Sequence, residues 1–206
     1  MRARVVGSIR VAEPGPVTRA LLDITHDVGG DRELADQICQ ACVVGLDVDG
    51  AALSLLTASS VRETLCATDA TAELVEDLQF SLGEGACVDA ALTGRPVLIA
   101  DLHHSTEVSR WPIFAGAVME QSDIGALFAV PMRWGTINLG VLDLYRKAPG
   151  PLSDTQLRDV VRAADLAALM ILWGRTDPGD GERLDYSLHG RAKIHQATGI
   201  VLVDSG

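Results

Sequence analysis

The spacing of apolar residues predicts two helices near the start of the chain. The first runs from Val17 to Val28 and carries an apolar residue every 3 or 4 positions, which is the narrow stripe of a helix that packs on other helices. Gly29 and Gly30 end it. Asp31 is suited to cap a second helix, whose apolar residues share one face until GLDVDG interrupts the pattern.

Short β-like runs alternate with short helices in the middle of the chain. AALSLLT and VRETLCAT, at 51–57 and 61–68, are rich in β-forming residues and predict a hairpin. TAELVEDLQF predicts a short helix. The glycine-rich SLGEGACV then leads into a helix that starts near Cys87 and ends at Gly94, and a strand follows from Pro96 to Ala100.

The last third predicts a long hairpin and a long helix. DIGALFAVPMRWGTINLGVLDLYRK divides at RWGT into two strands, which brings the total to about five. SDTQ is a capping box in which Ser153 and Gln156 satisfy backbone N–H groups, and it starts a helix that runs to Trp173.

The final turns of that helix, LAALMILW, are apolar on every side. A helix without a polar side needs two apolar neighbours, and one sheet supplies only one of them. We therefore expect a homodimer in which this helix forms a bundle with the Val17 to Val28 helix. The alternative is that both neighbours lie in the same chain.

Composition limits the classes of function. The chain has 206 residues, of which 48% are hydrophobic and 22% charged, as expected of a globular protein. Its formal net charge of −11 argues against nucleic-acid binding through the overall field. The longest apolar run, Leu166 to Trp173, is far shorter than the ~20 residues that span a bilayer. With no secretory h-region, we expect a cytoplasmic protein without membrane contact and with reduced cysteines.

The order of elements, together with LGEGACVDAALTGRPVLIADL and VPMRWGTINLGVLDLYRKAPGPLSD, resembles a GAF domain over Val17 to Trp173. More narrowly, it resembles the GAF domain of actinobacterial GAF-ANTAR regulators. The resemblance implies an α+β fold, with an antiparallel sheet of five to six strands and helices packed on one face. A ligand cavity is expected under loops on the other face.

The end of the chain resembles the beginning of an ANTAR domain, a three-helix RNA-binding module that acts in transcription antitermination. RAKIHQATGIVL, from Arg191 to Leu202, carries this resemblance, which implies that Arg191 and Lys193 contact RNA phosphates. Only 19 residues remain from Leu188 to Gly206, so we expect the module to be present as its first helix alone.

Four segments follow from these patterns: a leader at 1–16, a GAF sensor at 17–173, a linker at 174–187 and the truncated ANTAR start at 188–206. They predict the sensor of a regulator that binds RNA and controls transcription antitermination. The alternative is a GAF module for small-molecule binding or dimerisation, without RNA-binding output in this chain.

The resemblance also suggests residues that contact an unknown small-molecule ligand. LGEGACV lies where GAF domains line their cavity, which makes Glu84 a polar contact. Cys87 follows it as a second candidate, although packing as a small core residue is the favoured interpretation. His103, Trp111 and Phe114 belong to the segment that often forms a lid over the pocket.

Several other functions are not expected. Cys39 and Cys42 form a CxxC inside a predicted helix, where core packing is favoured over redox chemistry. The motif of cyclic-nucleotide-binding GAF domains is missing from YRKAPGPLSDTQ. IADLHHSTEVSRWPIFAGAV lacks the resolving cysteine of methionine sulfoxide reductases, so we expect no enzyme, catalytic residue, cofactor or metal. Asp143 either hydrogen-bonds near the pocket or points outward from its strand, and the outward direction is the favoured interpretation.

Overall fold

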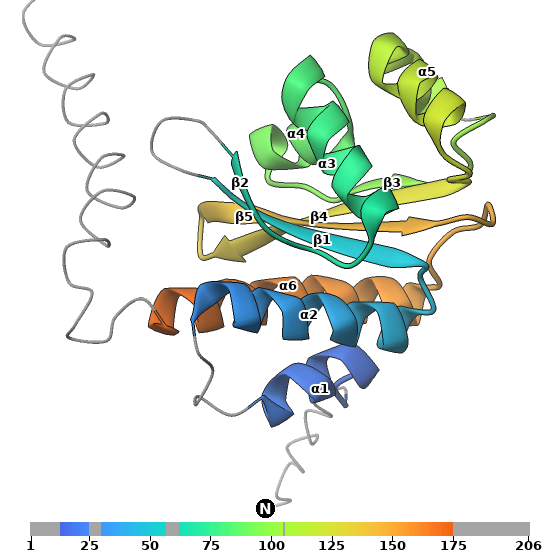
Figure 1. Cartoon of the computed structure of the whole chain (residues 1–206). Coiled ribbons are helices and arrows are strands. Elements are labelled where there is room, and N and C mark those ends of the chain that lie inside the picture. Colours follow the sequence, from blue (N-terminus) through green and yellow to red (C-terminus); the bar gives the residue numbers. More distant parts are fainter. Residues whose placement is uncertain (1–12, 25–29, 57–61, 105, 175–206) are drawn as a thin grey trace, which may run out of the picture.

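The computed structural model describes residues 13–24, 30–56, 62–104 and 106–174, and their centre is one antiparallel five-stranded sheet (Figure 1). The strand order is β2-β1-β5-β4-β3, so the two longest strands lie in the middle. The strands are β1 (Gly50–Leu56), β2 (Arg62–Ala67), β3 (Val97–Ile99), β4 (Ala126–Trp134) and β5 (Ile137–Arg146). The predicted α+β class and the antiparallel sheet are confirmed.

Helices cover both faces of the sheet. One face carries α2 (Asp31–Leu46) and α6 (Asp154–Gly174), and α1 (Pro16–Asp23) packs on the outer side of these two helices, as Figure 1 shows. The opposite face, where loops were expected, carries α3 (Ala70–Leu82), α4 (Ala86–Thr93) and α5 (Pro112–Gln121) as well. A short 3-10 helix, η1 (Thr106–Arg110), precedes α5. The sheet is therefore the middle layer of three.

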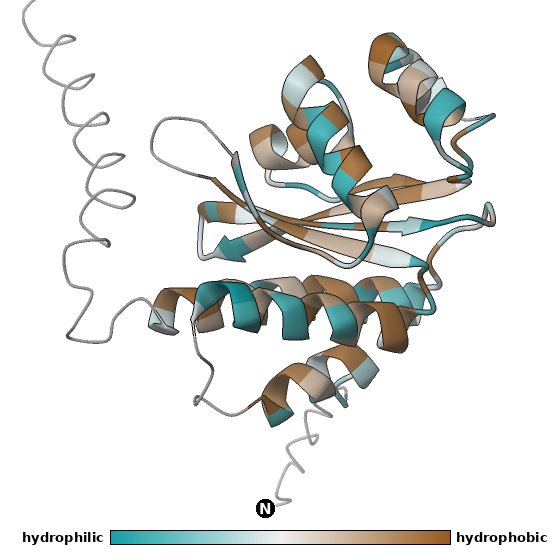
Figure 2. Cartoon of the chain, in the orientation of Figure 1, coloured by the Kyte–Doolittle hydropathy of each residue, from teal (hydrophilic) through white to brown (hydrophobic). Residues whose placement is uncertain are grey.

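Side chains on the strands alternate between two separate cores. Along β5, Leu142 and Leu144 belong to the core under α1, α2 and α6, whereas Val141 and Tyr145 belong to the core under α3, α4 and α5. Because both faces are covered, the central strands are apolar almost throughout. The helices differ from these strands, because α2 and α3 mix hydrophilic and hydrophobic residues along their length (Figure 2).

The helix ends agree with the predicted signals in part. Ser153 and Gln156 form the capping box, with N–H to side-chain oxygen distances of 2.9 and 3.2 Å. The first helix is shorter than predicted, because Ile24 is extended, with φ −66° and ψ 119°. Gly30, with φ 130°, is the N-cap of α2, so Asp31 is the first helical residue and not the cap.

A buried aspartate holds α1 against α6. The Asp159 carboxylate accepts hydrogen bonds from the N–H groups of Val17 (2.8 Å) and Thr18 (3.2 Å) and from the Thr18 hydroxyl (2.6 Å). These N–H groups lie in the first turn of α1 and have no partner inside the helix. A side chain at Gly15 would collide with this carboxylate. Asp159 therefore caps α1 from another helix.

The long final helix has neighbours on more than one side within its own chain. α6 packs on β4 and β5 and also contacts α1 and α2. Trp173 in its last turn is nevertheless 57% exposed. None of the described helices combines the length and apolar character needed to cross a membrane. The predicted linker, apart from Gly174 at the end of α6, the C-terminal helix with Arg191 and Lys193, and most of the predicted leader lie outside the described residues.

Candidate functional site

The inner face of α3 is partly polar. Ala72, Val75, Glu76 and Gln79 form its buried stripe, at the spacing of one helix face. The helix begins at Asp69, whose carboxylate accepts hydrogen bonds from the N–H groups of Thr71 and Ala72 at 2.8 and 2.9 Å. The fold therefore turns a carboxylate and an amide toward the sheet.

Glu76 is the centre of a buried hydrogen-bond network. One carboxylate oxygen accepts hydrogen bonds from the Ser54 hydroxyl on β1 and the Thr64 hydroxyl on β2, the latter at 3.4 Å. The other oxygen accepts from the Gln79 amide at 3.4 Å. The two hydroxyls lie 3.1 Å apart. All of these donors are uncharged, so they orient the carboxylate without neutralising it.

Gln79 extends the network to α4. Its amide oxygen accepts a hydrogen bond from the N–H of Cys87 at 2.8 Å. The turn before α4 passes close to this amide, because a Cβ on Gly85 would lie 2.6 Å from the Gln79 oxygen. Gly85 also has a φ of 124°, which a residue with a side chain rarely adopts. The glycines of LGEGACV thus allow the contact between α3 and α4.

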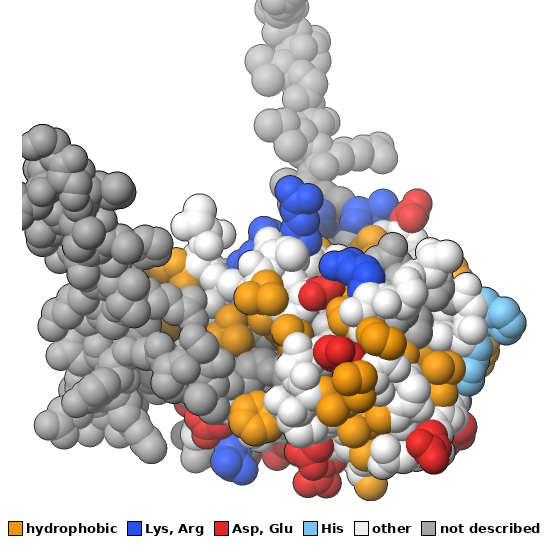
Figure 3. All heavy atoms as spheres, turned by 90° about the horizontal axis from the view of Figure 1, so that it is seen from above, with side chains coloured by type: hydrophobic (Ala, Val, Ile, Leu, Met, Phe, Trp, Pro, Cys, Tyr) orange, Lys and Arg blue, Asp and Glu red, His pale blue; other side chains and the backbone are white. Residues whose placement is uncertain are grey.

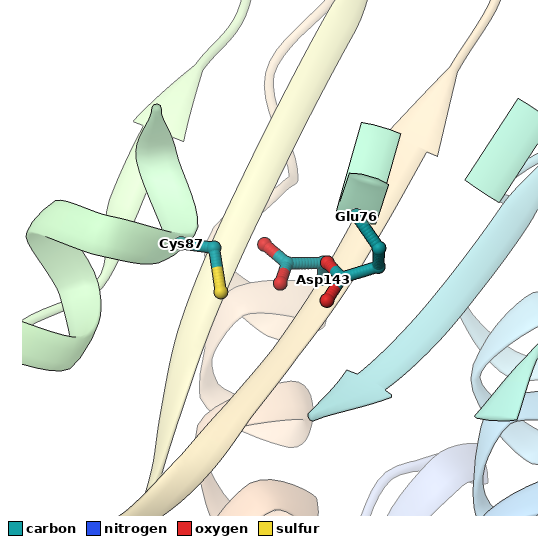
Figure 4. Close-up of side chains that lie close together, drawn as sticks. All are labelled: Glu76, Cys87 and Asp143. Carbon is teal, nitrogen blue, oxygen red and sulfur yellow. The ribbon is translucent and has the colours of Figure 1, made fainter. Parts of the chain in front are cut away.

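Three side chains from different elements converge under α3 (Figure 4). Glu76 comes from α3, Cys87 from α4 and Asp143 from β5, and their ligand atoms all lie within 4.8 Å of one another. All three residues are buried. Carboxylate oxygens and a sulfur are donors for a metal ion such as Zn²⁺, so this triad could hold a cation. Two carboxylates this close in a buried site favour binding of positive charge.

The prediction that Asp143 points outward was wrong. The residue is only 3% exposed, and the alternation of β5 puts it on the same face as Val141 and Tyr145. The error came from treating one face of the sheet as solvated. On a central strand that helices cover on both faces, every side chain points into a core.

A cleft opens beside Glu76 at the edge between β2 and α3. Its volume is about 140 Å³, and it is lined by Thr64, Glu76, Asp77 and Phe80. Glu76 is 4% exposed, whereas Phe80 is 59% exposed. In Figure 3, which shows this side of the molecule, acidic side chains lie among hydrophobic ones near the centre. The cleft thus joins the surface to the buried network.

Glu84 contacts the backbone at the start of α5. One oxygen of its carboxylate accepts hydrogen bonds from the N–H groups of Ile113 and Phe114, both at 3.1 Å. These groups belong to the first turn of α5, where a negative charge is favourable. Glu84 therefore caps α5 from the turn between α3 and α4.

The predicted lid residues lie in two different environments. Trp111 and Phe114 are buried, with ring centroids 6.5 Å apart in an edge-to-face arrangement. His103 is exposed, and its N–H donates to the Asp101 carboxylate at 3.0 Å. None of the five residues predicted to contact ligand lines the cleft beside Phe80. Cys87 alone among them joins the buried triad.

The residues that build the network were missed by sequence reasoning. Ser54, Thr64, Glu76 and Gln79 carry no recognisable motif. The signal for Glu76 and Gln79 was the helical period, because they lie 4 and 7 positions after Ala72 and so share its buried face. A charged residue on a predicted inner face marks a buried polar site.

Three of the four cysteines lie on the other side of the sheet from Cys87. Cys39, Cys42 and Cys66 belong to the core under α1, α2 and α6. Burial, together with Asp159 and Cys66, raises the pKa of Cys42 to about 12. A hydrogen bond with Cys66, together with burial, raises the pKa of Cys39 well above its usual value. Raised pKa values disfavour thiolates, as expected of thiols that pack in a core.

Residues 31–172 match the family model described as GAF domain. The chain belongs to the GAF family. This confirms the resemblance at the level of the domain, and GAF domains act as sensor and ligand-binding modules in signalling proteins. No curated protein shows significant similarity to the chain.

Solved structures share the GAF fold at low sequence identity. The GAF domain of a phosphoenolpyruvate-protein phosphotransferase from Coxiella burnetii is 13% identical, with a TM-score of 0.61 over 77% of this chain and 92% of that one. The corresponding domain from Acinetobacter is 13% identical, with a TM-score of 0.58, covering 77% and 90%. A type II free methionine-R-sulfoxide reductase from Thermoplasma acidophilum is 18% identical, with a TM-score of 0.53, covering 68% and 92%. These likenesses show the fold alone.

Proposed function

We propose that this GAF domain is a sensor that binds a small molecule in the cleft between β2 and α3, beside the buried network around Glu76. The buried network around Glu76 is the observation that supports this proposal. Buried polar groups cost stability relative to apolar packing, even when they are hydrogen-bonded. A chain that retains a carboxylate, an amide and two hydroxyls at this position gains from them the means to recognise a polar ligand.

Native mass spectrometry of the purified protein tests the proposal. We expect a retained small molecule, or a compound from a metabolite panel that raises the unfolding temperature. The S54A and T64V variants should lose this increase in unfolding temperature, whereas S109A, on the exposed surface, should keep it. If no compound in a broad panel binds, or if S109A and S54A behave alike, the sensor proposal fails.

We infer further that the sensor serves a regulator that binds RNA and controls transcription antitermination. The similarity of RAKIHQATGIVL to the start of an ANTAR domain supports this inference. Ligand binding would then shift the final helix of the sensor and with it the RNA-binding segment. The second candidate is a ligand-binding or dimerisation module without RNA-binding output in this chain, which the net charge of −11 favours.

Titration of a labelled paired-hairpin RNA with the 206-residue chain separates these candidates. The RNA-binding function predicts saturable binding that weakens as salt rises, because phosphate contacts release counterions. R191A and K193A should weaken it, while R158A, in α6, serves as the matched control. Absence of binding, or equal effects of all three substitutions, would support the module without RNA output.

We also propose that the protein is a homodimer and not an enzyme. Leu22 in α1, Val44 in α2 and Trp173 in α6 are 61%, 84% and 57% exposed, and apolar side chains of this size favour a partner surface. Light scattering after gel filtration would show a mass of two chains, and W173E would lower it. Cys87 lies across the sheet from the other thiols, which supports the absence of reductase activity toward free methionine sulfoxide.

A further inference from the structure

The cleft between β2 and α3 carries information about the ligand. Its volume of about 140 Å³ corresponds to about five water molecules at ~30 Å³ each. This is room for one small molecule or for one end of a larger one. Among the residues that the structure describes, Thr64, Glu76, Asp77 and Phe80 line the cleft, so the chemistry of the ligand can be argued from these four side chains.

The first feature of the cleft is its negative charge. Glu76 and Asp77 are adjacent in the sequence and both line it. No ion pair among the described residues includes either of them. The hydrogen bonds of Glu76 come from uncharged groups, and the Asp143 carboxylate lies behind it, within the buried triad. Burial lowers the local dielectric constant, which strengthens the attraction of Glu76 for a cation.

The second feature is an exposed aromatic ring. Phe80 follows Glu76 by four residues on α3, so the two side chains share one side of the helix. The Phe80 ring is 59% exposed and lines the cleft beside a carboxylate, so a ligand in the cleft contacts it. Aromatic faces attract cations, and alkylated ammonium groups gain both this attraction and apolar contact. An anion would meet repulsion from the two carboxylates.

We propose that this cleft binds a small organic cation with an alkylated ammonium group. Glu76 and Asp77 supply the opposite charge, Phe80 contacts the alkyl groups, and the Thr64 hydroxyl completes the wall. The inference rests on the proposed sensor function and adds to it the charge and class of the ligand. It assigns no catalytic role to these residues.

Calorimetric titration of the full chain with choline, compared with its neutral isostere 3,3-dimethylbutan-1-ol, tests the proposal. Choline should bind saturably, and the neutral alcohol at least about tenfold more weakly, because it lacks the interaction with the carboxylates. E76Q should weaken choline binding about tenfold or more. F80A should weaken it about two- to fivefold, as expected for an exposed cation–π contact.

Matched variants separate local charge from general effects. E73Q removes an exposed carboxylate from the same helix and should leave choline affinity unchanged. If E76Q does not fold, D77N tests the proposal instead. Asp77 is exposed, and loss of its charge should weaken choline binding in a salt-dependent way.

Two results would overturn the proposal. One is equal affinity for choline and the neutral alcohol, and the other is an effect of E73Q as large as that of D77N. Its failure is distinguishable from failure of the sensor function. If a neutral or anionic compound stabilises the protein and S54A abolishes this effect, the sensor stands and the cation class is wrong. If no compound binds, both proposals fail.

Discussion

Replacing Asp159 with alanine should detach α1 from α6. The Asp159 carboxylate holds two backbone N–H groups and one hydroxyl of α1, all of them buried. Each buried donor left without a partner costs ~1–3 kcal/mol, and loss of a helix cap costs ~1 kcal/mol. Since water can enter the space that the side chain leaves, we expect D159A to lower the free energy of unfolding by about 3–4 kcal/mol.

The structure also predicts the order of effects among related variants. T18V removes only the hydroxyl contact and should cost about 1 kcal/mol. D159N keeps the size of the side chain but loses its charge and one acceptor, so its cost should fall between the other two. D36A removes an exposed aspartate of α2 and should change stability by less than about 0.5 kcal/mol.

Urea unfolding followed by circular dichroism measures these differences, and hydrogen exchange localises them. A helix of 8 residues is not stable by itself, so the amides of α1 should exchange faster in D159A than in the wild type. The exchange rates of the β4 amides should change only as much as the change in global stability requires. Equal stability of D159A and D36A, or unchanged exchange in α1, would refute the role of Asp159.

Four other predictions follow from contacts described above. E84A should lower the free energy of unfolding by about 1–2 kcal/mol in urea titrations, because α5 loses its cap; an unchanged midpoint would contradict this. G85A should destabilise the protein through its strained φ and the contact with the buried amide, whereas G116A, in open space within a helix, should stabilise it by ~0.5–1 kcal/mol. Cys42 should react with a disulfide reagent at pH 8 only after unfolding, since its pKa of about 12 leaves almost no thiolate; prompt reaction of the native protein would refute this. Desolvation raises the pKa of Tyr145 from 10.0 to about 12, so its contribution to stability is complete below pH 10 and is lost as pH rises toward 12. Ultraviolet titration of wild type and Y145F measures this, and ionisation near pH 10 in the folded protein would contradict it.

Local signals in the sequence located most of the elements. The capping box at Ser153 started α6 as predicted, and Gly94 ended α4 in a left-handed conformation. Such signals act within a few residues, so the pattern of one segment is enough to predict them. Ile24 shows the limit of this approach, because an apolar residue at helical spacing continued the stripe although the helix had already ended.

The candidate site depended on contacts between distant segments and was harder to predict. Glu84 was expected to contact ligand, but its partners in α5 lie 29 and 30 residues away in the sequence. Asp143 was misplaced because the covering of both sheet faces is a property of the whole fold. Glu76 lay in a recognisable buried stripe, yet its hydroxyl partners come from β1 and β2. Local periodicity predicts the direction of a side chain but does not identify the residues that it contacts.

The position of Asp143 in the central strand has a mechanical consequence. Its neighbours along the chain, Leu142 and Leu144, point into the opposite core, which α6 covers. One peptide unit therefore separates the buried Asp143, on the α3 side of the sheet, from a leucine in the core that α6 covers. If ligand binding moved the β5 backbone, Leu142 and Leu144 would carry that movement into the core under α6, because no loop or hinge lies between them and Asp143.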